Sequence, residues 1–371
     1  MTNPLRERLI ARIRETGPIT VAAYMAECLA DPADGYYMGG DPFGAAGDFV
    51  TAPEVSQMFG ELIGAWTLAL WYRIGAPDPI RLVELGPGRG TLMADFLRVA
   101  SLDAAFLKAA SLHLVEISPA LKARQAETLN GAPLMPEWHD RFEDIPDGPV
   151  LVVANEFFDA LPVHQFVRTE TGWQERLVGL DGDGALAFVT GPTRLPDAAV
   201  PPSCRSAGVG AILETSPAST AVMTAIADRI VKDGGGALAI DYGHFRAAPG
   251  DTFQAIRGHA YADPLAEPGR ADLTAHVDFE ALAAAAEAAG AVAHSGLTQT
   301  DFLLKLGLIE RAGRLGNGQE ERVQNDIRDA VERLAGPDAM GHLFKVLAVT
   351  GPGILPEPFD SRPAAPHDPQ E

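Results

Sequence analysis

The sequence predicts an α/β fold with a doubly wound parallel sheet, and two features of the chain support this prediction. From residue 80 onward, short runs that are apolar throughout alternate with segments of helical periodicity. A glycine-rich turn at residues 86–90 joins the first apolar run to the first of these helices. Uninterrupted apolar runs are typical of strands buried on both faces, and strand–helix alternation is how parallel strands are connected. We therefore expect a ligand site at the carboxyl edge of this sheet.

The residues that precede the sheet, 1–78, predict a mainly helical region. Apolar positions between residues 5 and 13 give an amphipathic helix that should end at Gly17-Pro18. Residues 34–48 hold too many turn formers for regular structure, so they predict a glycine-rich loop.

A second helix is expected after this loop. Thr51-Ala-Pro-Glu54 has the form of a capping box with proline in the first turn. Apolar residues at helical spacing follow up to Leu70, and Gly75 stands where a helix would stop.

The core, 79–350, is expected to alternate strands and helices. The expected strands are 80–84, 112–116, 134–138, 150–154, 237–241, 291–297 and 344–350. The expected helices are 91–99, 119–129, a helix that Ser216 caps and that ends at Gly234, 278–290, and helices within 300–335.

Two insertions and a tail complete the expected organisation. Residues 164–212 alternate in polarity around an Asp181-Gly-Asp-Gly184 turn and predict a β-hairpin that leaves the core. Residues 244–335 predict an insertion of lid and helices, since 244–274 is polar, has little periodicity and is long enough for a functional loop. The proline-rich tail, 351–371, is expected to be mobile.

The composition limits the partners of the protein. The chain has 29 Lys and Arg against 50 Asp and Glu, which gives a formal net charge of −21. Such a surface repels phosphate backbones, so nucleic acid is excluded as the main partner. The charge could steer a basic protein or a cationic side chain toward a cleft, although solubility alone would also account for it.

The cysteines and the apolar stretches indicate a cytoplasmic protein without a metal site. Cys28 and Cys204 stand far apart, which is typical of free thiols in a reducing compartment rather than of metal ligands. No apolar stretch approaches the roughly 20 residues that cross a bilayer. Arginines among the first 14 residues suggest an organellar presequence, but Glu7 and Glu15 interrupt them.

The glycine-rich turn indicates which ligand the sheet binds. Gly86, Gly88 and Gly90 are spaced G-x-G-x-G, unlike the G-x-G-x-x-G of dinucleotide sites, and they let the backbone approach a ligand closely. Pro87 removes an amide that a pyrophosphate would use. Glu84 brings an anionic side chain, which disfavours a pyrophosphate and suits a ligand with an ammonium and a sulfonium. A methionine-type cofactor therefore fits, and the rival prediction, an NAD(P)-dependent oxidoreductase, fits poorly.

Two further acids are candidates for the same ligand. Glu116 ends the second expected strand, where an acid can accept hydrogen bonds from both hydroxyls of a ribose, although an exposed glutamate is also common there. Asp140, in His139-Asp140 after the third strand, offers a polar contact to an adenine amine.

Four segments resemble the MidA-like methyltransferases, a family that includes a mitochondrial complex I assembly factor that methylates protein arginine. The segments are Gly47-Asp-Phe-Val-Thr-Ala-Pro-Glu54, Glu84-Leu-Gly-Pro-Gly-Arg-Gly90, Asn155-Glu-Phe-Phe-Asp-Ala-Leu-Pro162 and Ala271-Asp-Leu-Thr-Ala-His276. The resemblance covers most of the chain. It implies a Rossmann-like class I methyltransferase fold with seven strands and S-adenosylmethionine as the methyl donor.

The resemblance also implies site residues. Carried over by position, Glu84, Gly86, Gly88, Gly90 and Glu116 would hold the cofactor. Gly47, Asp48 and Thr51 would close over it. The implied acceptor is an arginine on a protein, with a link to complex I assembly.

The fourth expected strand delivers the candidate catalytic residues, Asn155, Glu156 and Asp159, to the carboxyl edge of the sheet. Methyl transfer requires that an acceptor lone pair lies in line with the methyl group and that water is excluded. Phe157 and Phe158 can shape a dry pocket, while Glu156 and Asp159 can hold a guanidinium through charge-assisted hydrogen bonds. Asn155 or Asp159 could instead cap a following helix.

Other functions and other residues remain open at this point. A small-molecule methyltransferase would carry the same cofactor motifs, and an assembly chaperone could bind the cofactor without turnover. Asp241 is a second acidic strand end, and Asp272, Thr274 and His276 could belong to a lid. The sequence assigns these residues no catalytic role and does not indicate the oligomeric state.

Overall fold

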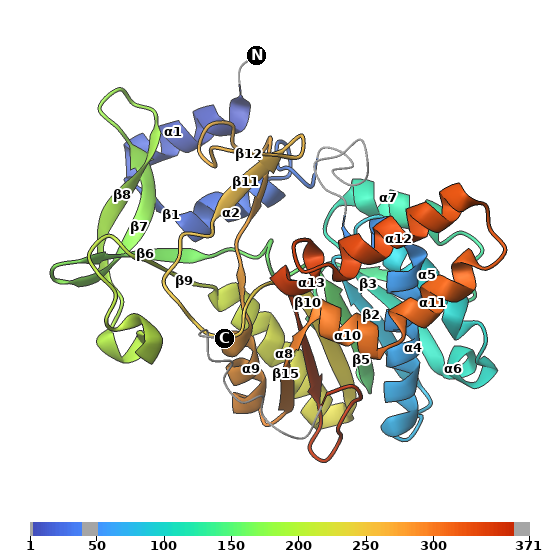
Figure 1. Cartoon of the computed structure of the whole chain (residues 1–371). Helices are drawn as coiled ribbons and strands as arrows, with labels where there is room; N and C mark the ends of the chain where they lie inside the picture. The colour runs from blue at the N-terminus through green and yellow to red at the C-terminus, as the bar shows by residue number, and fades with distance from the viewer. Residues whose placement is uncertain (1–2, 39–50, 360–371) are drawn as a thin grey trace.

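The main sheet has eight strands, of which seven lie in the order β15–β16–β10–β5–β2–β3–β4 and the eighth, β14, pairs with β10 (Figure 1). The computed structural model describes residues 3–38 and 51–359. The strands are β2 (Ile80–Leu85), β3 (Ala110–Val115), β4 (Pro136–His139), β5 (Val150–Asn155), β10 (Gly235–His244), β14 (Val277–Asp278), β15 (Val292–Thr298) and β16 (Phe344–Thr350). β16 runs antiparallel to both of its neighbours, and the pairs from β10 to β4 are parallel. The predicted α/β fold is confirmed.

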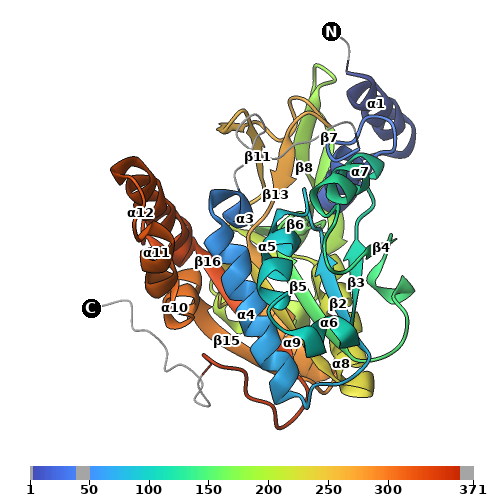
Figure 2. The same ribbon diagram turned by 90° about the vertical axis from the view of Figure 1, so that its right-hand side faces the viewer.

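Helices cover both faces of this sheet, because its strands are apolar on both faces. In β5, Leu151 and Val153 face one core, and Val152 and Ala154 face the other. The first core is covered by α4 (Gln57–Arg73), α5 (Thr91–Ala100), α6 (Ala104–Ala109) and α10 (Gln299–Lys305). The second core is covered by α8 (Pro217–Asp233) and α9 (Phe279–Ala288). Figure 2 shows α4 and α5 on one side of the strands and α8 and α9 on the other.

A smaller β-rich part lies beside the main sheet, at the left of Figure 1. Its first sheet has the order β1–β7–β6–β9, with β8 paired to β7. These strands are β1 (Ile19–Thr20), β6 (His164–Thr169), β7 (Gly172–Leu180), β8 (Leu186–Arg194) and β9 (Ile212–Thr215). A third hydrophobic core of the molecule lies in this part, and it includes apolar residues of α1 (Pro4–Thr16) and α2 (Val21–Ala30). The predicted hairpin is thus present as β7–β8, but it belongs to a five-stranded sheet that a strand of the N-terminal region completes.

The segment 244–274 is not a loop without regular structure, as the sequence suggested. It contains a three-stranded sheet in the order β12–β11–β13, made of β11 (Gln254–Arg257), β12 (Ala260–Ala262) and β13 (Asp272–Thr274). All three residues of β12 are exposed, and all three of β13 are buried. Strands this short carry no alternation to recognise, and tertiary packing decides their burial.

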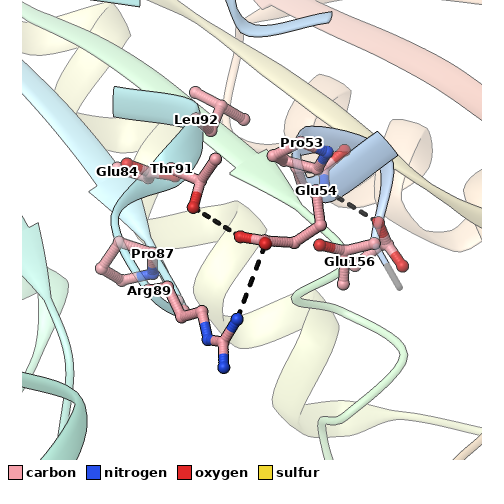
Figure 3. A pocket seen from close by; sticks show the side chains of 12 residues that line it. Pro53, Glu54, Glu84, Pro87, Arg89, Thr91, Leu92 and Glu156 are labelled. Atoms are coloured by element: carbon pink, nitrogen blue, oxygen red, sulfur yellow. Dashed lines mark hydrogen bonds and ion pairs between the residues drawn. The ribbon is translucent and has the colours of Figure 1, made fainter. Parts of the chain in front are cut away.

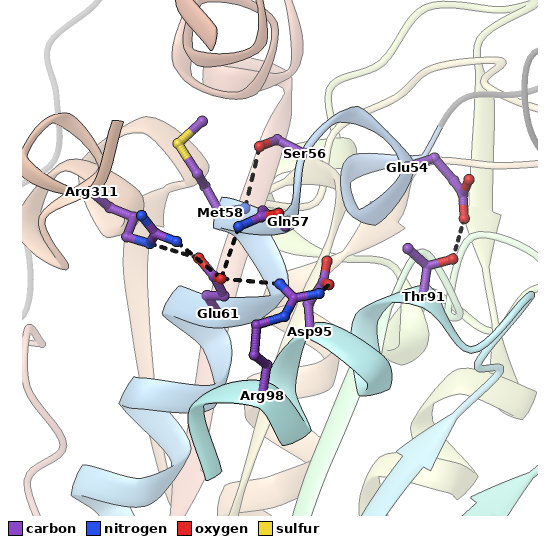
Figure 4. Close-up of polar contacts among 9 residues, drawn as sticks. All are labelled: Glu54, Ser56, Gln57, Met58, Glu61, Thr91, Asp95, Arg98 and Arg311. Atoms are coloured by element: carbon purple, nitrogen blue, oxygen red, sulfur yellow. Dashed lines mark hydrogen bonds and ion pairs between the residues drawn. The ribbon is translucent and has the colours of Figure 1, made fainter. Parts of the chain in front are cut away.

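The helix predicted from Thr51 is two helices. α3 (Ala52–Val55) ends at Ser56, whose side chain caps α4 by accepting a hydrogen bond from the Met58 amide at 3.2 Å. The prediction of a capping box at Thr51 was wrong, because the Thr51 side chain makes no capping hydrogen bond. The Glu54 carboxylate is used elsewhere: it accepts a hydrogen bond from the Thr91 hydroxyl at 2.5 Å (Figure 4).

Of two amphipathic helices, α11 (Leu308–Gly316) packs beside α4, and α12 (Glu321–Ala335) packs against α11 and α3. The short helix α13 (Met340–Leu343) leads into β16. The Arg311 guanidinium donates two hydrogen bonds, at 2.7 and 3.1 Å, to the buried Glu61 carboxylate of α4. Arg98 of α5 reaches the same carboxylate at 3.1 Å (Figure 4). Glu61 therefore joins three helices around one charge. Within the described ranges, no helix has the length and hydropathy that crossing a bilayer requires.

Candidate active site

The glycine-rich turn follows β2 and brings backbone, without side chains, to the carboxyl edge of the sheet. Gly86, Gly88 and Gly90 have φ angles of +60°, +53° and +80°, which side chains disfavour. A Cβ at Gly86 would lie 2.9 Å from the Phe157 ring, so the turn has no room for one. Gly90 is the N-cap residue of α5.

Glu84 lies at the end of β2 with an unsatisfied carboxylate oxygen. Its side chain is 3% exposed, and among the described residues its Oε2 has no hydrogen-bond partner. Burial raises the pKa of Glu84 to about 8. A buried carboxylate without a partner is costly unless a cationic ligand supplies the missing charge and hydrogen bonds.

A cavity opens between the glycine-rich turn, α3 and the end of β5 (Figure 3). Its lining residues are Thr51, Pro53, Glu54, Glu84, Gly86, Pro87, Gly88, Arg89, Thr91, Leu92, Asn155 and Glu156. Figure 3 shows the Glu54 carboxylate pointing toward Thr91 and Arg89, and its Oε2 lies 3.7 Å from Arg89 Nη1. The cavity thus combines residues that the sequence assigned to the cofactor with two that it assigned to catalysis.

Glu116 lies directly after β3 and is held in place by its neighbours. Its carboxylate accepts hydrogen bonds from the Ser118 amide at 2.8 Å and from Gln125 Nε2 at 3.1 Å. The same Gln125 amide donates to the Gly88 carbonyl at 2.8 Å, while its oxygen accepts from Trp138 Nε1 at 2.8 Å. The fully buried Gln125 therefore links Glu116 to the glycine-rich turn. Sequence reasoning missed it, since nothing distinguishes one glutamine within α7 (Pro119–Thr128).

Asp140 is not among the residues that line the cavity. Its carboxylate, 71% exposed, accepts a hydrogen bond from Lys122 Nζ at 2.7 Å. This contact and the Lys122 charge lower the pKa of Asp140. Gly47 and Asp48 lie outside the described residues, as does the tail beyond residue 359.

Glu156 stands at the opposite wall of the cavity, after β5, with a φ of +50° that is unusual for a residue with a side chain. Its Oε1 accepts hydrogen bonds from the Ala52 amide at 3.0 Å and from Asn155 Nδ2 at 3.1 Å. Burial, with the nearby Asp159 charge, raises the pKa of Glu156 to about 7. Asn155 keeps one buried oxygen, Oδ1, without a partner among the described residues.

Asp241, on β10, organises the turn that carries these acids. Its Oδ2 accepts hydrogen bonds from the amides of Phe157, Phe158 and Asp159 at 2.9–3.2 Å, and its Oδ1 accepts from the Tyr242 amide at 2.9 Å. The side chain is fully buried, and burial with the charges of Asp159 and Glu156 raises its pKa. With four backbone partners, Asp241 is a structural anchor rather than a free acid.

Asp159 has one occupied and one unoccupied oxygen. Its Oδ2 accepts a hydrogen bond from the Tyr242 hydroxyl at 2.5 Å, and its buried Oδ1 has no partner among the described residues. Burial raises the pKa of Asp159 to about 6. No helix follows β5 before β6 begins at His164, so neither Asn155 nor Asp159 caps one.

Residues of the β-rich part lie next to Asp159 and Tyr242. Asp272 of β13 accepts a hydrogen bond from the Tyr37 hydroxyl at 2.9 Å. The His276 ring lies against Tyr242 with centroids 5.6 Å apart, and burial lowers the pKa of His276. Sequence reasoning missed both tyrosines, because only the fold brings residues 37, 159, 242 and 272 together.

Comparison with known proteins gives consistent matches. Residues 62–297 match the family model Methyltransf_28, described as "Putative S-adenosyl-L-methionine-dependent methyltransferase". The chain is 41% identical to "Protein arginine methyltransferase NDUFAF7 homolog, mitochondrial" of Drosophila melanogaster, over 97% of this chain and 87% of that protein. It is 38% identical to the Homo sapiens protein of the corresponding name, over 93% of this chain and 83% of that protein.

A solved structure is also similar over most of its length. It is a COG1565 superfamily member from Burkholderia thailandensis bound to S-adenosyl-homocysteine. The identity is 30%, the TM-score is 0.83, and the alignment covers 93% of this chain and 91% of that one.

These comparisons correct one prediction. The sequence indicated a cytoplasmic protein, but the Drosophila melanogaster and Homo sapiens relatives just described are named as mitochondrial, which contradicts that prediction. The prediction was wrong because free cysteines and short apolar stretches are also found in mitochondrial proteins, and because it took Glu7 and Glu15 as evidence against a presequence. In the structure these residues belong to α1, whose apolar side packs in a core, and a packed helix carries no information about the compartment.

Proposed function

Because the chain belongs to the Methyltransf_28 family of S-adenosylmethionine-dependent methyltransferases, we propose that it methylates arginine side chains of a protein substrate. The methyl donor follows from the family. The acceptor is proposed from the acids at the end of β5 together with the names of the relatives. The observation that carries the proposal is the pair Glu156 and Asp159, two acids with raised pKa values beside the cofactor cavity.

The cavity residues fit this cofactor. Glu84 has a buried oxygen that lacks a partner, which suits the ammonium of a methionine moiety. Glu116, fixed by Ser118 and Gln125, is placed to accept hydrogen bonds from ribose hydroxyls. The glycine-rich turn gives the ligand access to backbone where a Cβ would collide with Phe157.

On this proposal, Glu156 and Asp159 hold and orient the acceptor guanidinium. Asp159 keeps Oδ1 available because the Tyr242 hydroxyl occupies its other oxygen, and Glu156 is fixed by Ala52 and Asn155. The bound cofactor supplies an electrophilic methyl group. When the N–C bond forms and the S–C bond breaks, the acceptor nitrogen loses one proton, since a methylated guanidinium keeps a single positive charge. Glu156, with a pKa of about 7, can take that proton near neutral pH.

The test is methylation with tritiated S-adenosylmethionine in an extract from cells that lack this protein. Label in proteins, found as methylarginine after hydrolysis, supports the proposal when wild-type protein produces it and Glu156→Gln does not. Label confined to the small-molecule fraction would support a metabolite methyltransferase instead. No label, with S-adenosylhomocysteine still raising the melting temperature, would support a cofactor-binding assembly factor without turnover. A link to complex I is tested by asking whether the labelled protein is a subunit of that complex.

A further inference from the structure

Three side chains of metal-ligating type meet at the β3–β4 edge of the main sheet, outside the cofactor cavity. His113 belongs to β3, and Glu137 and His139 belong to β4. The strands pair in register with His113 opposite Glu137 and Val115 opposite His139, so all three side chains lie on one face. Each offers one ligand atom, and these atoms lie within 4.8 Å of one another. The proposed methyl transfer uses none of them.

The separations between the ligand atoms are close to those of a metal site. His113 Nδ1 lies 2.9 Å from His139 Nε2 and 4.0 Å from Glu137 Oε2. Ligand atoms at about 2.0–2.2 Å from a tetrahedral Zn²⁺ are roughly 3.3–3.5 Å apart. The two imidazole nitrogen atoms would move apart by about half an ångström to admit the ion. The Glu137 carboxylate would move closer to them, which its 63% exposed side chain allows.

The hydrogen bonding of His113 prepares its Nδ1 as a ligand. Its Nε2 lies 2.8 Å from the Ser111 hydroxyl. When Nε2–H donates to that oxygen, the Nδ1 lone pair accepts the hydrogen bond from His139 Nε2 at 2.9 Å. A bound ion would replace the proton that these two nitrogen atoms share. An outer hydrogen bond like that to Ser111 is what fixes the tautomer of metal-bound histidines.

We propose that His113, Glu137 and His139 bind one divalent transition-metal ion of the Zn²⁺ class. Two imidazoles and a carboxylate form a donor set that this class of ion prefers, and three protein ligands leave a fourth position for water. His113 is buried, His139 is half-buried and Glu137 is exposed, so an ion can reach the site from solvent. The His139 carbonyl accepts a hydrogen bond from the Glu116 amide at 3.0 Å. The ion would therefore hold β4 beside the proposed ribose-binding acid.

The test uses the full chain after treatment with a chelator. Isothermal titration with Zn²⁺ and absorption spectroscopy with Co²⁺ should give one ion per chain, with the visible bands of low-coordinate Co²⁺. Glu137→Gln and His139→Gln should each weaken binding at least about tenfold. His342→Gln changes an exposed histidine on α13 and serves as the matched control, with binding unchanged.

Stability supplies a second readout that does not depend on catalysis. Zn²⁺ should raise the melting temperature of wild-type protein and of His342→Gln but not of Glu137→Gln. The Glu137 side chain is exposed, so this variant should fold even if His139→Gln does not. The proposal is overturned if wild-type protein binds neither Zn²⁺ nor Co²⁺, or if binding is the same in Glu137→Gln as in wild type.

Discussion

The two halves of the sheet edge use carboxylates in different ways. On the β2–β3 side, Glu84 lies at the end of one apolar strand, has a carboxylate oxygen without a partner among the described residues, and lines the cavity beside the glycine-rich turn. On the β5–β10 side, Asp159 and Asp241 come from segments 82 residues apart and share one turn. The Asp241 carboxylate accepts hydrogen bonds from four backbone amides, whereas Asp159 keeps one oxygen without a partner among the described residues. The first half is thus a contiguous segment proposed to hold the cofactor, while the second carries the proposed acceptor-binding acids on a turn that the Asp241 carboxylate holds in place.

The largest effect on stability is expected from removing the Asp241 carboxylate. Asp241→Ala would leave buried amides of residues 157–159 and 242 without an acceptor. We expect a loss on the order of 3–5 kcal/mol of unfolding free energy. Differential scanning calorimetry should show the fall in melting temperature, with the exposed Asp197→Ala as control. An unchanged melting temperature would mean that Asp241 does not anchor the turn.

Next in size is the effect of Glu156→Gln on catalysis. Loss of one charged group that acts on the acceptor should lower kcat about 100-fold to 1,000-fold. Cofactor affinity should change little, because the free oxygen of Glu84 belongs to the other half of the edge. Single-turnover methylation and calorimetric binding of S-adenosylhomocysteine separate the two quantities, with exposed Glu170→Gln as the matched control. A loss of cofactor affinity equal to the loss of rate would break the division into two halves.

A smaller, pH-dependent effect is expected for Glu84. Its pKa of about 8 means that a cationic ligand must displace a proton to pair with the carboxylate. Affinity for S-adenosylhomocysteine should therefore rise from pH 6 to pH 8 in wild-type protein. Glu84→Gln should bind roughly tenfold more weakly at pH 8 and lack this rise. A wild-type affinity that does not vary with pH would contradict the pairing.

The same pKa predicts how stability varies with pH in the ligand-free protein. The folded-state pKa of Glu84 is raised above its ordinary value near 4.5. Its contribution to stability is therefore complete below pH 4.5 and is lost as the pH rises through about 8. Denaturant titrations at pH 5 and pH 8 should show that Glu84→Gln loses less stability than wild type across this interval. If both proteins lost the same stability between pH 5 and pH 8, a group other than Glu84 would be responsible for the pH dependence.

The smallest effect is expected from Asp140→Asn. The carboxylate pairs with Lys122 at the surface rather than lining the cavity, so cofactor affinity should fall less than about threefold, as for other exposed ion pairs. Calorimetry with S-adenosylhomocysteine decides this point. A fall of tenfold or more would restore the adenine contact that the sequence suggested.

Local sequence signals predicted the main sheet, and they placed the proposed cofactor residues in one short segment, for a physical reason. The strand of Ile80–Leu85, the positive-φ glycines and Glu84 lie within eleven residues, so chain connectivity alone places them together. The apolar strands and the helix capped by Ser216 are likewise local features. By contrast, the capping box at Thr51 failed because a tertiary contact, Glu54 with Thr91, replaced the local one.

What the sequence determined by itself was the alternation of strands and helices in the main sheet, the glycine-rich turn and the position of Glu84 next to it. These follow from burial, backbone freedom and charge within short segments. Only the tertiary structure decided that Asp241 anchors rather than reacts, and that Tyr242 occupies one oxygen of Asp159. It also placed Gln125 between Glu116 and Gly88, and His113 beside Glu137 and His139. These contacts join residues that are distant in the chain, so no local pattern encodes them, and side-chain hydrogen bonding within the folded sheet decides each role.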